Sequence, residues 1–544
     1  MTRPLLAAVP FVVCALLYAT AMRGHFLSDD MAVIYVLSEW LDKGELWTRL
    51  FAKFASGLDA PSHYYRPLAF LTYGVNLLTG MNPLSWHLVN LAGHLLGGVA
   101  VYRISALLLP ETDGRTGAVF AAALFLLCAT SAEPVAWISG RYDVFATALS
   151  LWAGALSLQS RSWRDRYAVA ALLCGILALT SKESGLIAPV LIGVLSWIKH
   201  RESDLAARWR ATVLDIVPWA VLVAGYFAMR LALFGSMLQV YPGTRPLQRF
   251  VDGSWVVSPQ IVWSWLLLQI PSRPTLILSI VLITVMAAYG IAALFRQRDL
   301  LRAFVGIFGA MLASLVMLLP HLTGLAANGE GGRLVYTTSA LLALLGGLLW
   351  TACARLMQSR AIAVALAGVG VALIAVQAAL LDVALAAWRS AGVQMGQLVV
   401  ALPVLSASIA SDGYAIVIAP DSIGPVPFAR NANGAMALPP IQAEPLLSKL
   451  IVFLPRELPN VPSLLRQGLI PTLKRYSLGE ATERFKQSAA TVDAAGVVWP
   501  SDVFCWPADG SQMKKLPLPA NLSAQTWVQA MRTALRNAGC DRVR

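Results

Sequence analysis

The chain has 544 residues, of which 57% are hydrophobic and 13% charged, and its mean hydropathy is +0.65. Soluble domains rarely exceed about half apolar residues, so this composition excludes a soluble globular enzyme and indicates an integral membrane protein. The net charge of +13 does not call for a nucleic-acid partner, because the basic residues concentrate in alternate loops between apolar runs.

Apolar runs of the length that crosses a bilayer, about 20 residues each, recur along the chain. We expect eleven spans, near residues 4–22, 85–109, 116–132, 141–159, 167–180, 184–199, 212–234, 274–295, 303–320, 334–353 and 361–388. The positive-inside rule then places the N-terminus in the cytoplasm and the C-terminal tail outside. The sequence Ala19-Thr20-Ala21 resembles a signal-peptide cleavage site, but we favour an uncleaved anchor.

Two of the loops expected outside the membrane are long, near residues 23–84 and 235–273. In the first, Ala32–Leu41 and Pro67–Leu78 have apolar residues at helical spacing. They predict helices along the membrane surface, with Trp40 and Trp47 at interfacial depth. In the second loop, Ile261–Ile270 is apolar but too short to span, which favours an interfacial or re-entrant helix.

The tail from about residue 390 onward differs in composition, since it holds half of the chain's 30 prolines and lacks a spanning run. Its expected elements are two strands and an amphipathic helix, at Tyr414–Ala419, Leu447–Leu454 and Ala524–Ala538. We interpret residues 390–544 as a small external α+β domain. Cys505 and Cys540 lie in this tail, where the spacing leaves both a disulfide and two free thiols open.

Five polar clusters interrupt the apolar chain, and the charge pattern puts all five on the external side. They are Ser28-Asp29-Asp30, Tyr64-Tyr65-Arg66-Pro67, Glu133 to Asp143, Ser181-Lys182-Glu183-Ser184, and Gly331-Gly332-Arg333 with Tyr336. Ionisable groups at membrane depth are costly, and are functional candidates for that reason. The simplest interpretation is that the five clusters form one site.

The Asp29-Asp30 pair follows the first span. A carboxylate at the mouth of a cleft could deprotonate an acceptor hydroxyl. The alternative is structural, because Ser28 or Asp29 ahead of an amphipathic helix is good N-cap chemistry.

Three cations are candidates for binding a phosphate. Lys182 lies in a very short segment between spans, near the depth of lipid phosphates, although an ion pair with its neighbour Glu183 explains it equally well. Arg141 could bind a phosphate through its guanidinium or hold an acid in place. Arg333 follows a glycine-rich stretch that permits close approach of the backbone to a ligand.

His87, Asn90 and His94 fall on one face of the second span. Metal binding is one interpretation, but we favour hydrogen bonds between helices. No cysteine–histidine spacing resembles a zinc site.

Several motifs, in this order along the chain, are typical of one family. They are Asp29-Asp30, Tyr65-Arg66-Pro67-Leu68, His87-x-x-Asn90-x-x-x-His94, Glu133-Pro-Val-Ala-Trp-Ile-Ser-Gly-Arg-Tyr-Asp143 and Ser181-Lys-Glu-Ser-Gly185. Together they resemble the polyprenyl-phosphate-dependent glycosyltransferases of the GT-C superfamily. The likeness is particularly to the transmembrane O-mannosyltransferases that also carry tetratricopeptide repeats, and to their bacterial relatives. It covers roughly residues 20–200, with a weaker likeness at Gly332–Tyr336.

The resemblance implies an inverting transferase with Asp29 or Asp30 as the base. It also implies a donor phosphate held by Lys182, Arg141 and Arg333. Supporting or substrate-binding roles are expected for Tyr65, Arg66, His87, His94, Glu133, Asp143, Glu183 and Tyr336. No metal site or cofactor is predicted, with a divalent cation left open. The proline-rich tail departs from the family, which carries a repeat array there, and this leaves the acceptor open.

We therefore expect an α-helical polytopic membrane protein of the GT-C type, with the transferase module at residues 1–389 and the external domain at 390–544. It would lie in a bacterial inner membrane. Its donor would be a polyprenyl-phosphate-linked sugar, and its acceptor a glycan, a lipid-linked saccharide or a protein. A transporter or flippase for a lipid-linked substrate, and a non-catalytic scaffold, are the alternatives.

Overall fold

The structure is a computed structural model. It describes residues 3–51, 64–109, 114–237, 273–318, 330–410, 415–460 and 502–540, with short gaps at 163, 202, 357–358, 433, 448, 511 and 520–523. The expected interfacial helix at Ile261–Ile270 and most of the second long loop lie outside these residues.

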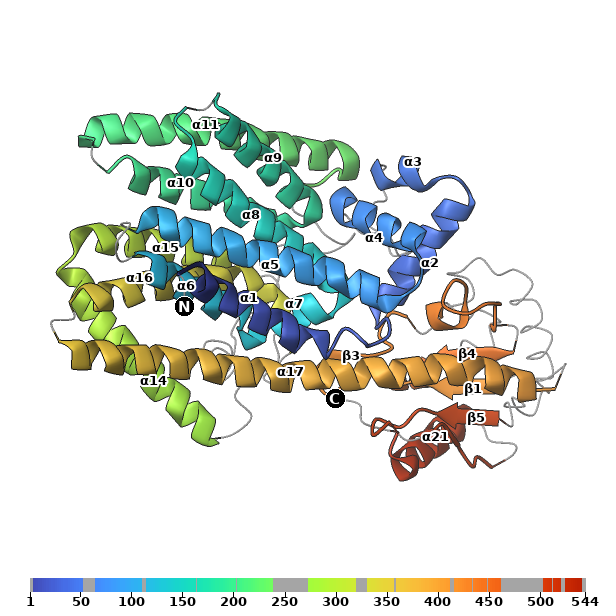
Figure 1. The fold of residues 1–544 in the computed structure, drawn as a ribbon. Helices are drawn as coiled ribbons and strands as arrows, with labels where there is room; N and C mark the ends of the chain where they lie inside the picture. Colours follow the sequence, from blue (N-terminus) through green and yellow to red (C-terminus); the bar gives the residue numbers. More distant parts are fainter. Residues whose placement is uncertain are drawn as a thin grey trace.

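A long bundle of helices forms the body of the molecule (Figure 1). Its long helices are α1 (Arg3–Ala19), α5 (Pro83–Leu108), α6 (Gly114–Leu126), α8 (Arg141–Gln159), α9 (Arg166–Ser181), α10 (Ile187–Lys199), α11 (Leu205–Phe234), α14 (Arg273–Phe295), α15 (Arg298–Leu318), α16 (Tyr336–Arg355) and α17 (Arg360–Ser408). A helix therefore coincides with each of the eleven expected spans.

Five helices among the described residues are long and apolar enough to cross a membrane, and a sixth is added if a bent pair forms one span. That pair is Arg115–Leu126 with Ala129–Ala136, which meet at 48°. The chain is thus a multi-pass membrane protein, while the number of eleven spans and their orientation stay predictions. The valines and leucines along the outer faces of α11 and α17 are exposed, as surfaces facing lipid would be.

Local sequence explains where several of these helices begin. The side chains of Asn82, Asp165, Asp204 and Ser359 each accept a hydrogen bond from a backbone N–H of the first turn of α5, α9, α11 and α17. Such caps satisfy donors that a helix N-terminus otherwise leaves without partners.

Short helices gather at one end of the bundle. They are α2 (Asp29–Asp42), α3 (Leu46–Phe51), α4 (Pro67–Thr79), α7 (Ala132–Ala136), and the 3₁₀ turns η1 (Ala129–Ser131), η2 (Ile138–Gly140), η3 (Glu183–Leu186) and η5 (Gly332–Val335). The helices expected at Ala32–Leu41 and Pro67–Leu78 are confirmed as α2 and α4. Trp47 is exposed and Trp40 is buried in the protein near Phe70, and the interfacial depth of both stays a prediction.

The tail carries a small mixed sheet in the order β4-β1-β5-β6. Its strands are β1 (Ala415–Ile418), β4 (Leu450–Phe453), β5 (Asp502–Cys505) and β6 (Lys514–Lys515). Strand β1 runs parallel to β4 and β5, with Ala415 opposite Leu450 and Asp502, whereas β6 is antiparallel to β5. The remaining elements are the hairpin of β2 (Ser422–Ile423) and β3 (Val426–Pro427), the turns η6 (Ala435–Ala437) and η7 (Pro455–Asn460), and α21 (Ala524–Ala538). Both expected strands and the expected helix are thus present.

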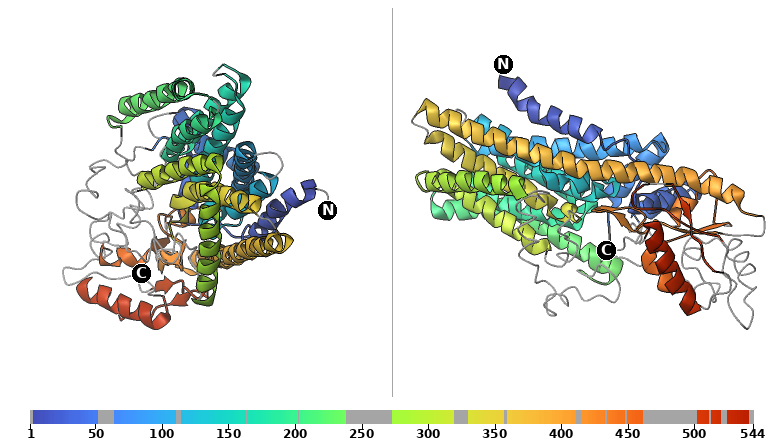
Figure 2. Two further views of the ribbon diagram at one scale, coloured as in Figure 1. Left: turned by 90° about the vertical axis from the view of Figure 1, so that its left-hand side faces the viewer. Right: turned by 90° about the horizontal axis from the view of Figure 1, so that it is seen from below.

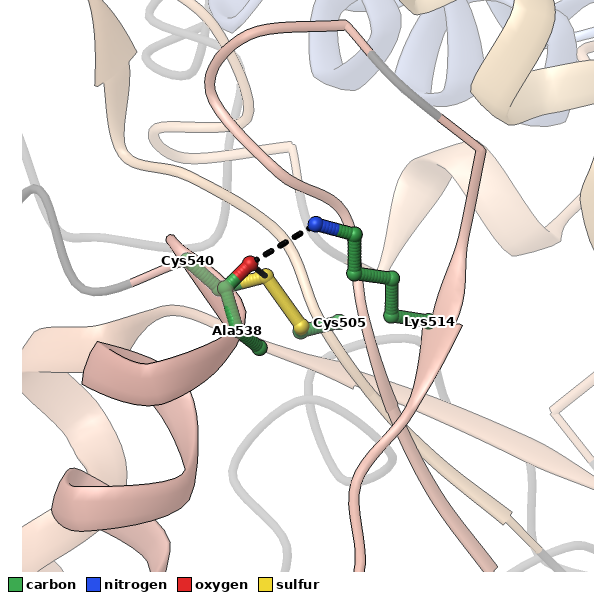
Figure 3. Close-up of a disulfide and its surroundings, with 4 residues drawn as sticks. All are labelled: Cys505, Lys514, Ala538 and Cys540. Carbon is green, nitrogen blue, oxygen red and sulfur yellow. Dashed lines mark hydrogen bonds between the residues drawn. A yellow bond between two sulfur atoms is a disulfide. The ribbon is translucent and has the colours of Figure 1, made fainter.

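A disulfide joins β5 to the end of α21. Cys505 and Cys540 are bonded, with their Cα atoms 6.3 Å apart. Figure 3 shows Lys514 Nζ beside this bond, donating a hydrogen bond of 3.0 Å to the Ala538 carbonyl. The pairing that the sequence left open is therefore formed in this structure.

Helix α17 connects the bundle to the tail. It runs the length of the molecule, and the strands lie beside its C-terminal end together with α2 (Figures 1 and 2). Gly24 and Gly392 meet where the chain leaves α1, since a Cβ on Gly392 would lie 2.5 Å from the Gly24 Cα. The His25 N–H donates to the Gly392 carbonyl at 3.1 Å. This close approach fixes the segment that leads into α2.

Candidate active site

The structure brings the five polar clusters together through direct contacts. Asp30 bonds to Ser139, Arg66 to Glu183, Lys182 to Asp143, and Glu133 to both Gly331 and Arg333. Every cluster is thus linked to at least one other, and the stretch from Glu133 to Asp143 touches three of them. Most of these residues lie in or next to the short helices and 3₁₀ turns, whereas Asp143 lies in the first turn of α8.

Arg141 stands at the centre of this framework and is fully buried. Its Nε donates to Asn90 at 2.9 Å, its Nη1 to Asn76 at 2.8 Å, and its Nη2 to the Trp86 carbonyl at 2.8 Å. The guanidinium also lies 4.4 Å from the centre of the Tyr73 ring. All three nitrogens donate to asparagine or backbone oxygens, so Arg141 has a structural role here, but its hydrogen-bond partners are not the acids that the second interpretation named.

Asp30 is a buried hydrogen-bond acceptor. Its Oδ1 accepts from the backbone N–H of Ser139 at 2.7 Å and from its hydroxyl at 2.6 Å, and its Oδ2 accepts from the Leu27 N–H at 3.0 Å. Burial raises the pKa of Asp30 to about 7, against the opposing effect of these hydrogen bonds. The carboxyl therefore ties α2 to η2.

Asp29 faces a different environment, since it lines a cavity of about 160 Å³. The other lining residues are Ser28, Glu133, Trp137, Glu330, Gly331, Arg333, Leu334, Pro427, Arg430 and Asn431. The Ser28 side chain makes no capping hydrogen bond to α2 and donates instead to the Arg430 carbonyl at 2.7 Å. Helix capping by Ser28 therefore does not account for this motif, and Asp29 is the carboxylate of the pair that a substrate in the cavity would meet.

Two further ion pairs lie at the boundary of α9 and α10. Lys182 Nζ donates to Asp143 Oδ1 at 2.5 Å, and Arg66 Nη2 donates to Glu183 Oε2 at 2.8 Å. Arg230 Nη1 approaches the other oxygen of Glu183 at 3.9 Å. Glu183 thus pairs with Arg66 and Arg230. The ion pair between the neighbours Lys182 and Glu183, which was the alternative to phosphate binding, is not formed, because each side chain pairs with residues distant in the sequence.

Lys182 lies near Arg66 and Arg333, and each of these three cations is also paired with a carboxylate. Burial lowers the pKa of Lys182 below its usual range, and Arg66 and Arg333 lower it further, while Asp143 opposes the shift. Two buried donors nearby, Nε of Arg66 and Oγ of Ser184, have no hydrogen-bond partner among the described residues. Crowded cations and unpaired donors are both stabilised by an added anion.

Arg333 is the most accessible of these cations. Its side chain is 34% exposed, against 18% for Lys182 and 13% for Arg66. Its Nε lies 3.6 Å from Glu133 Oε1, and its guanidinium is 4.4 Å from the centre of the Trp137 ring. Because the Gly331 N–H also donates to Glu133, at 2.7 Å, one buried carboxylate holds the loop that presents Arg333.

The two histidines make hydrogen bonds inside the bundle. His94 Nδ1 shares a 2.7 Å hydrogen bond with the Tyr336 hydroxyl, and His87 Nε2 lies 3.3 Å from the Gly24 carbonyl. Asn90 donates to the Trp137 carbonyl at 2.7 Å. These contacts agree with the favoured interpretation of hydrogen bonding between helices. Within the described part of the chain, no group of three or more His, Cys, Asp or Glu side chains is arranged to hold a metal ion.

Among the predicted site residues, Tyr65 has the fewest contacts with the rest of the site. It is partly buried, which raises the pKa of its phenol. Its neighbour Tyr64 instead covers Arg66, whose guanidinium lies 3.9 Å from the centre of the Tyr64 ring.

Several residues of the site were not found from the sequence. They are Ser139, Arg230, Glu330, Arg430 and Asn431. Ser139 lies inside a motif that was singled out, and Glu330 lies in the glycine-rich stretch, so both could have been proposed. Arg430 and Asn431 come from the tail, and no local pattern marks them.

The chain is similar to protein O-mannosyl-transferases. It is 31% identical to the Drosophila melanogaster protein O-mannosyl-transferase Tmtc1 over 199 residues, which cover 35% of this chain and 22% of that protein. It is 35% identical to mouse protein O-mannosyl-transferase TMTC1 over 168 residues, covering 28% of this chain and 17% of that protein. The matched region thus spans about a fifth of each relative. No protein-family model matches the chain.

Two solved structures are similar at low identity. ArnT from Cupriavidus metallidurans, bound to undecaprenyl phosphate, has a TM-score of 0.42 and 15% identity, covering 76% of this chain and 82% of that one. The Archaeoglobus fulgidus oligosaccharyltransferase has a TM-score of 0.43 and 11% identity, covering 76% of this chain and 61% of that one.

Proposed function

We propose that this protein is an integral-membrane glycosyltransferase that moves a sugar from a polyprenyl-phosphate donor to an acceptor hydroxyl on the extracytoplasmic face. The observation that carries the proposal is that Asp29 and Arg333 line the same cavity. A carboxylate that can take a proton and a cation that can hold a phosphate are the two groups this reaction needs. The similarity to protein O-mannosyl-transferases supports the same class of reaction.

Asp29 is the proposed general base. It would accept the proton of the acceptor hydroxyl as the oxygen attacks the anomeric carbon of the sugar. The bond between that carbon and the phosphate oxygen breaks in the same displacement, so the configuration at the anomeric carbon inverts. The polyprenyl phosphate leaves with the electron pair of the broken bond.

Arg333 and Lys182 are the proposed phosphate-binding groups, and Arg66 lies close enough to Lys182 to add to the positive potential there. Negative charge grows on the phosphate as the bond breaks, and fixed cations at this point lower the barrier. The crowding of cations around Lys182 and the unpaired donors of Arg66 and Ser184 support an anion here. Glu133 and Asp143 would keep the cations in place between turnovers.

The test is consumption of radiolabelled polyprenyl-phosphate sugars by membranes that contain the protein. We expect the wild type to consume one donor of a panel and Asp29→Asn to lose roughly 10²–10⁴-fold in rate. Asp42→Asn, at the exposed end of the same helix, is the matched control and should keep full activity. If no donor is consumed, the proposed function is wrong, and if Asp29→Asn is as active as the wild type, the assignment of Asp29 as the base is wrong.

A further inference from the structure

The tail lines the cavity with Pro427, at the end of β3, and with the turn at Arg430 and Asn431. Asn431 Nδ2 donates to Asp29 Oδ1 at 2.9 Å, across 402 positions of the chain. Immediately before Asp29, the Ser28 N–H donates to the Phe428 carbonyl at 2.7 Å and the Ser28 hydroxyl to the Arg430 carbonyl, also at 2.7 Å. The tail and the segment carrying Asp29 are therefore joined by both backbone and side-chain hydrogen bonds.

The same turn also holds the loop that carries Arg333. Arg430 forms an ion pair with Glu330 and donates to Asp421 at 2.9 Å. Glu330 precedes Gly331, whose N–H is bound by Glu133, and Arg333 follows two residues later. Two adjacent tail residues thus contact the loops that carry the proposed base and the proposed phosphate-binding arginine.

The backbone is unusual on both sides of this contact. Ser28 has φ 50° and Asn431 has φ 62°, and they are the non-glycine residues with positive φ in the described part of the chain. Such a conformation costs on the order of 1–2 kcal/mol and persists where surrounding contacts enforce it. Asparagine tolerates it better than most side chains, which suits it to the position opposite Asp29.

We propose that this tail turn completes the active site, with Asn431 as the residue that positions the Asp29 carboxylate. The inference rests on the proposed function and goes beyond it. Asn431 fixes one carboxylate oxygen and leaves the second for the acceptor proton. Because Pro427, Arg430 and Asn431 also line the cavity, the acceptor would bind against the tail as well as against the membrane-embedded module.

Two substitutions of Asn431 remove the side-chain amide that donates to Asp29 and leave the backbone conformation accessible. Asn431→Gly retains the ability to adopt positive φ without cost, and Asn431→Asp retains the shape but replaces the donor by a charge that repels Asp29. Lys515→Gln, on β6 and outside the cavity lining, is the control within the tail. Each full-length variant is compared with the wild type by kcat, donor KM and melting temperature.

We expect both Asn431 variants to lose roughly tenfold to a hundredfold in kcat, since small misplacements of a catalytic group have effects of this size. Donor KM should stay within about twofold and the melting temperature should match that of Lys515→Gln. Unchanged kcat in both variants, with an active wild type, overturns the inference and leaves the proposed function standing. A parallel loss of kcat, donor affinity and melting temperature also overturns it, because that result indicates a general structural role. A wild type that consumes no donor refutes the proposed function itself, and this inference with it.

Discussion

Asp29 and Asp30 are adjacent in the chain, yet their carboxylates face opposite environments. Asp29 Oδ1 accepts from an asparagine of the tail at the wall of a cavity, whereas Asp30 is 3% exposed and accepts three hydrogen bonds inside the protein. The two residues are the first two of α2, and their side chains project from the helix in different directions. This division of roles leads to different expectations for the two acids.

Asp30→Asn should destabilise the protein. The amide nitrogen of asparagine cannot accept from the donors of Leu27 or Ser139, so at least one buried donor is left unpaired, at a cost of about 1–3 kcal/mol. Melting in detergent solution should show a lower midpoint for Asp30→Asn and an unchanged one for Asp29→Asn. A stable but inactive Asp30→Asn, beside an active Asp29→Asn, would instead make Asp30 the base.

Asp30 should also make stability depend on pH. Its pKa is raised from 3.8 to about 7 by burial in the folded protein. Between pH 3.8 and about pH 7 the folded state holds a proton that the unfolded chain has released. The contribution of Asp30 to the free energy of unfolding is therefore complete below about pH 4 and is lost as the pH rises through 7. From pH 5 to pH 8, the stability advantage of wild type over Asp30→Asn should shrink by about 2–3 kcal/mol. A constant difference would show that the folded carboxyl titrates at its ordinary pKa.

Replacing Lys182 should affect both stability and donor binding, and a double substitution separates the two. Lys182→Met leaves Asp143, whose side chain is 7% exposed, without its partner, which costs about 3–5 kcal/mol. Lys182→Met with Asp143→Leu removes both charges, so stability should return while the donor KM stays raised by roughly tenfold or more. Recovery of the wild-type donor KM in the double variant would refute a role for Lys182 in binding phosphate.

Arg141→Lys should impair folding rather than donor binding. A lysine ammonium cannot reach Asn90, Asn76 and the Trp86 carbonyl together, as the guanidinium does. Each buried polar group left unpaired should cost about 1–3 kcal/mol, visible as a low yield of monodisperse protein. A well-folded Arg141→Lys with a raised donor KM would return Arg141 to the phosphate site predicted from the sequence.

Breaking the Cys505–Cys540 disulfide should loosen the tail. The bond closes a loop with a sequence separation of 35, and a loop of this size corresponds to about 3–4 kcal/mol of stabilisation. Cys540→Ser should therefore be cut faster by protease within the tail, while fragments from the helical body appear at the wild-type rate. Equal protection of the tail in both proteins would show that the sheet holds without the bond.

Local patterns in the sequence located the long helices, two surface helices, two strands and the tail helix, and they grouped the site, but they did not predict β5 and β6. Helical spacing located α2, α4 and α21, and a buried apolar run located β1 and β4. The five clusters could be grouped because membrane topology reduces the arrangement of loops to two sides, and all five fell on one side. The contacts of Asp30, Lys182, Glu183 and Arg333 bear out that grouping.

The partner of each charged group could not be read from the sequence. Lys182 and Glu183 are neighbours, but their side chains bind Asp143 and Arg66, on other elements. Arg141 has the spacing of a site residue, and only three-dimensional packing shows that its donors are used internally. Asn431 lies 402 positions from Asp29, beyond the reach of any motif.

Helix α17 has 49 residues, which at 1.5 Å each gives a rod of about 73 Å. A bilayer core is about 30 Å thick, so a continuous helix that crosses it extends well beyond one surface. The tail is fastened along this extension, where Gln442 Nε2 donates to the Val399 carbonyl at 3.1 Å. Because the tail is attached to one long helix, that helix fixes the position of the tail relative to the rest of the bundle.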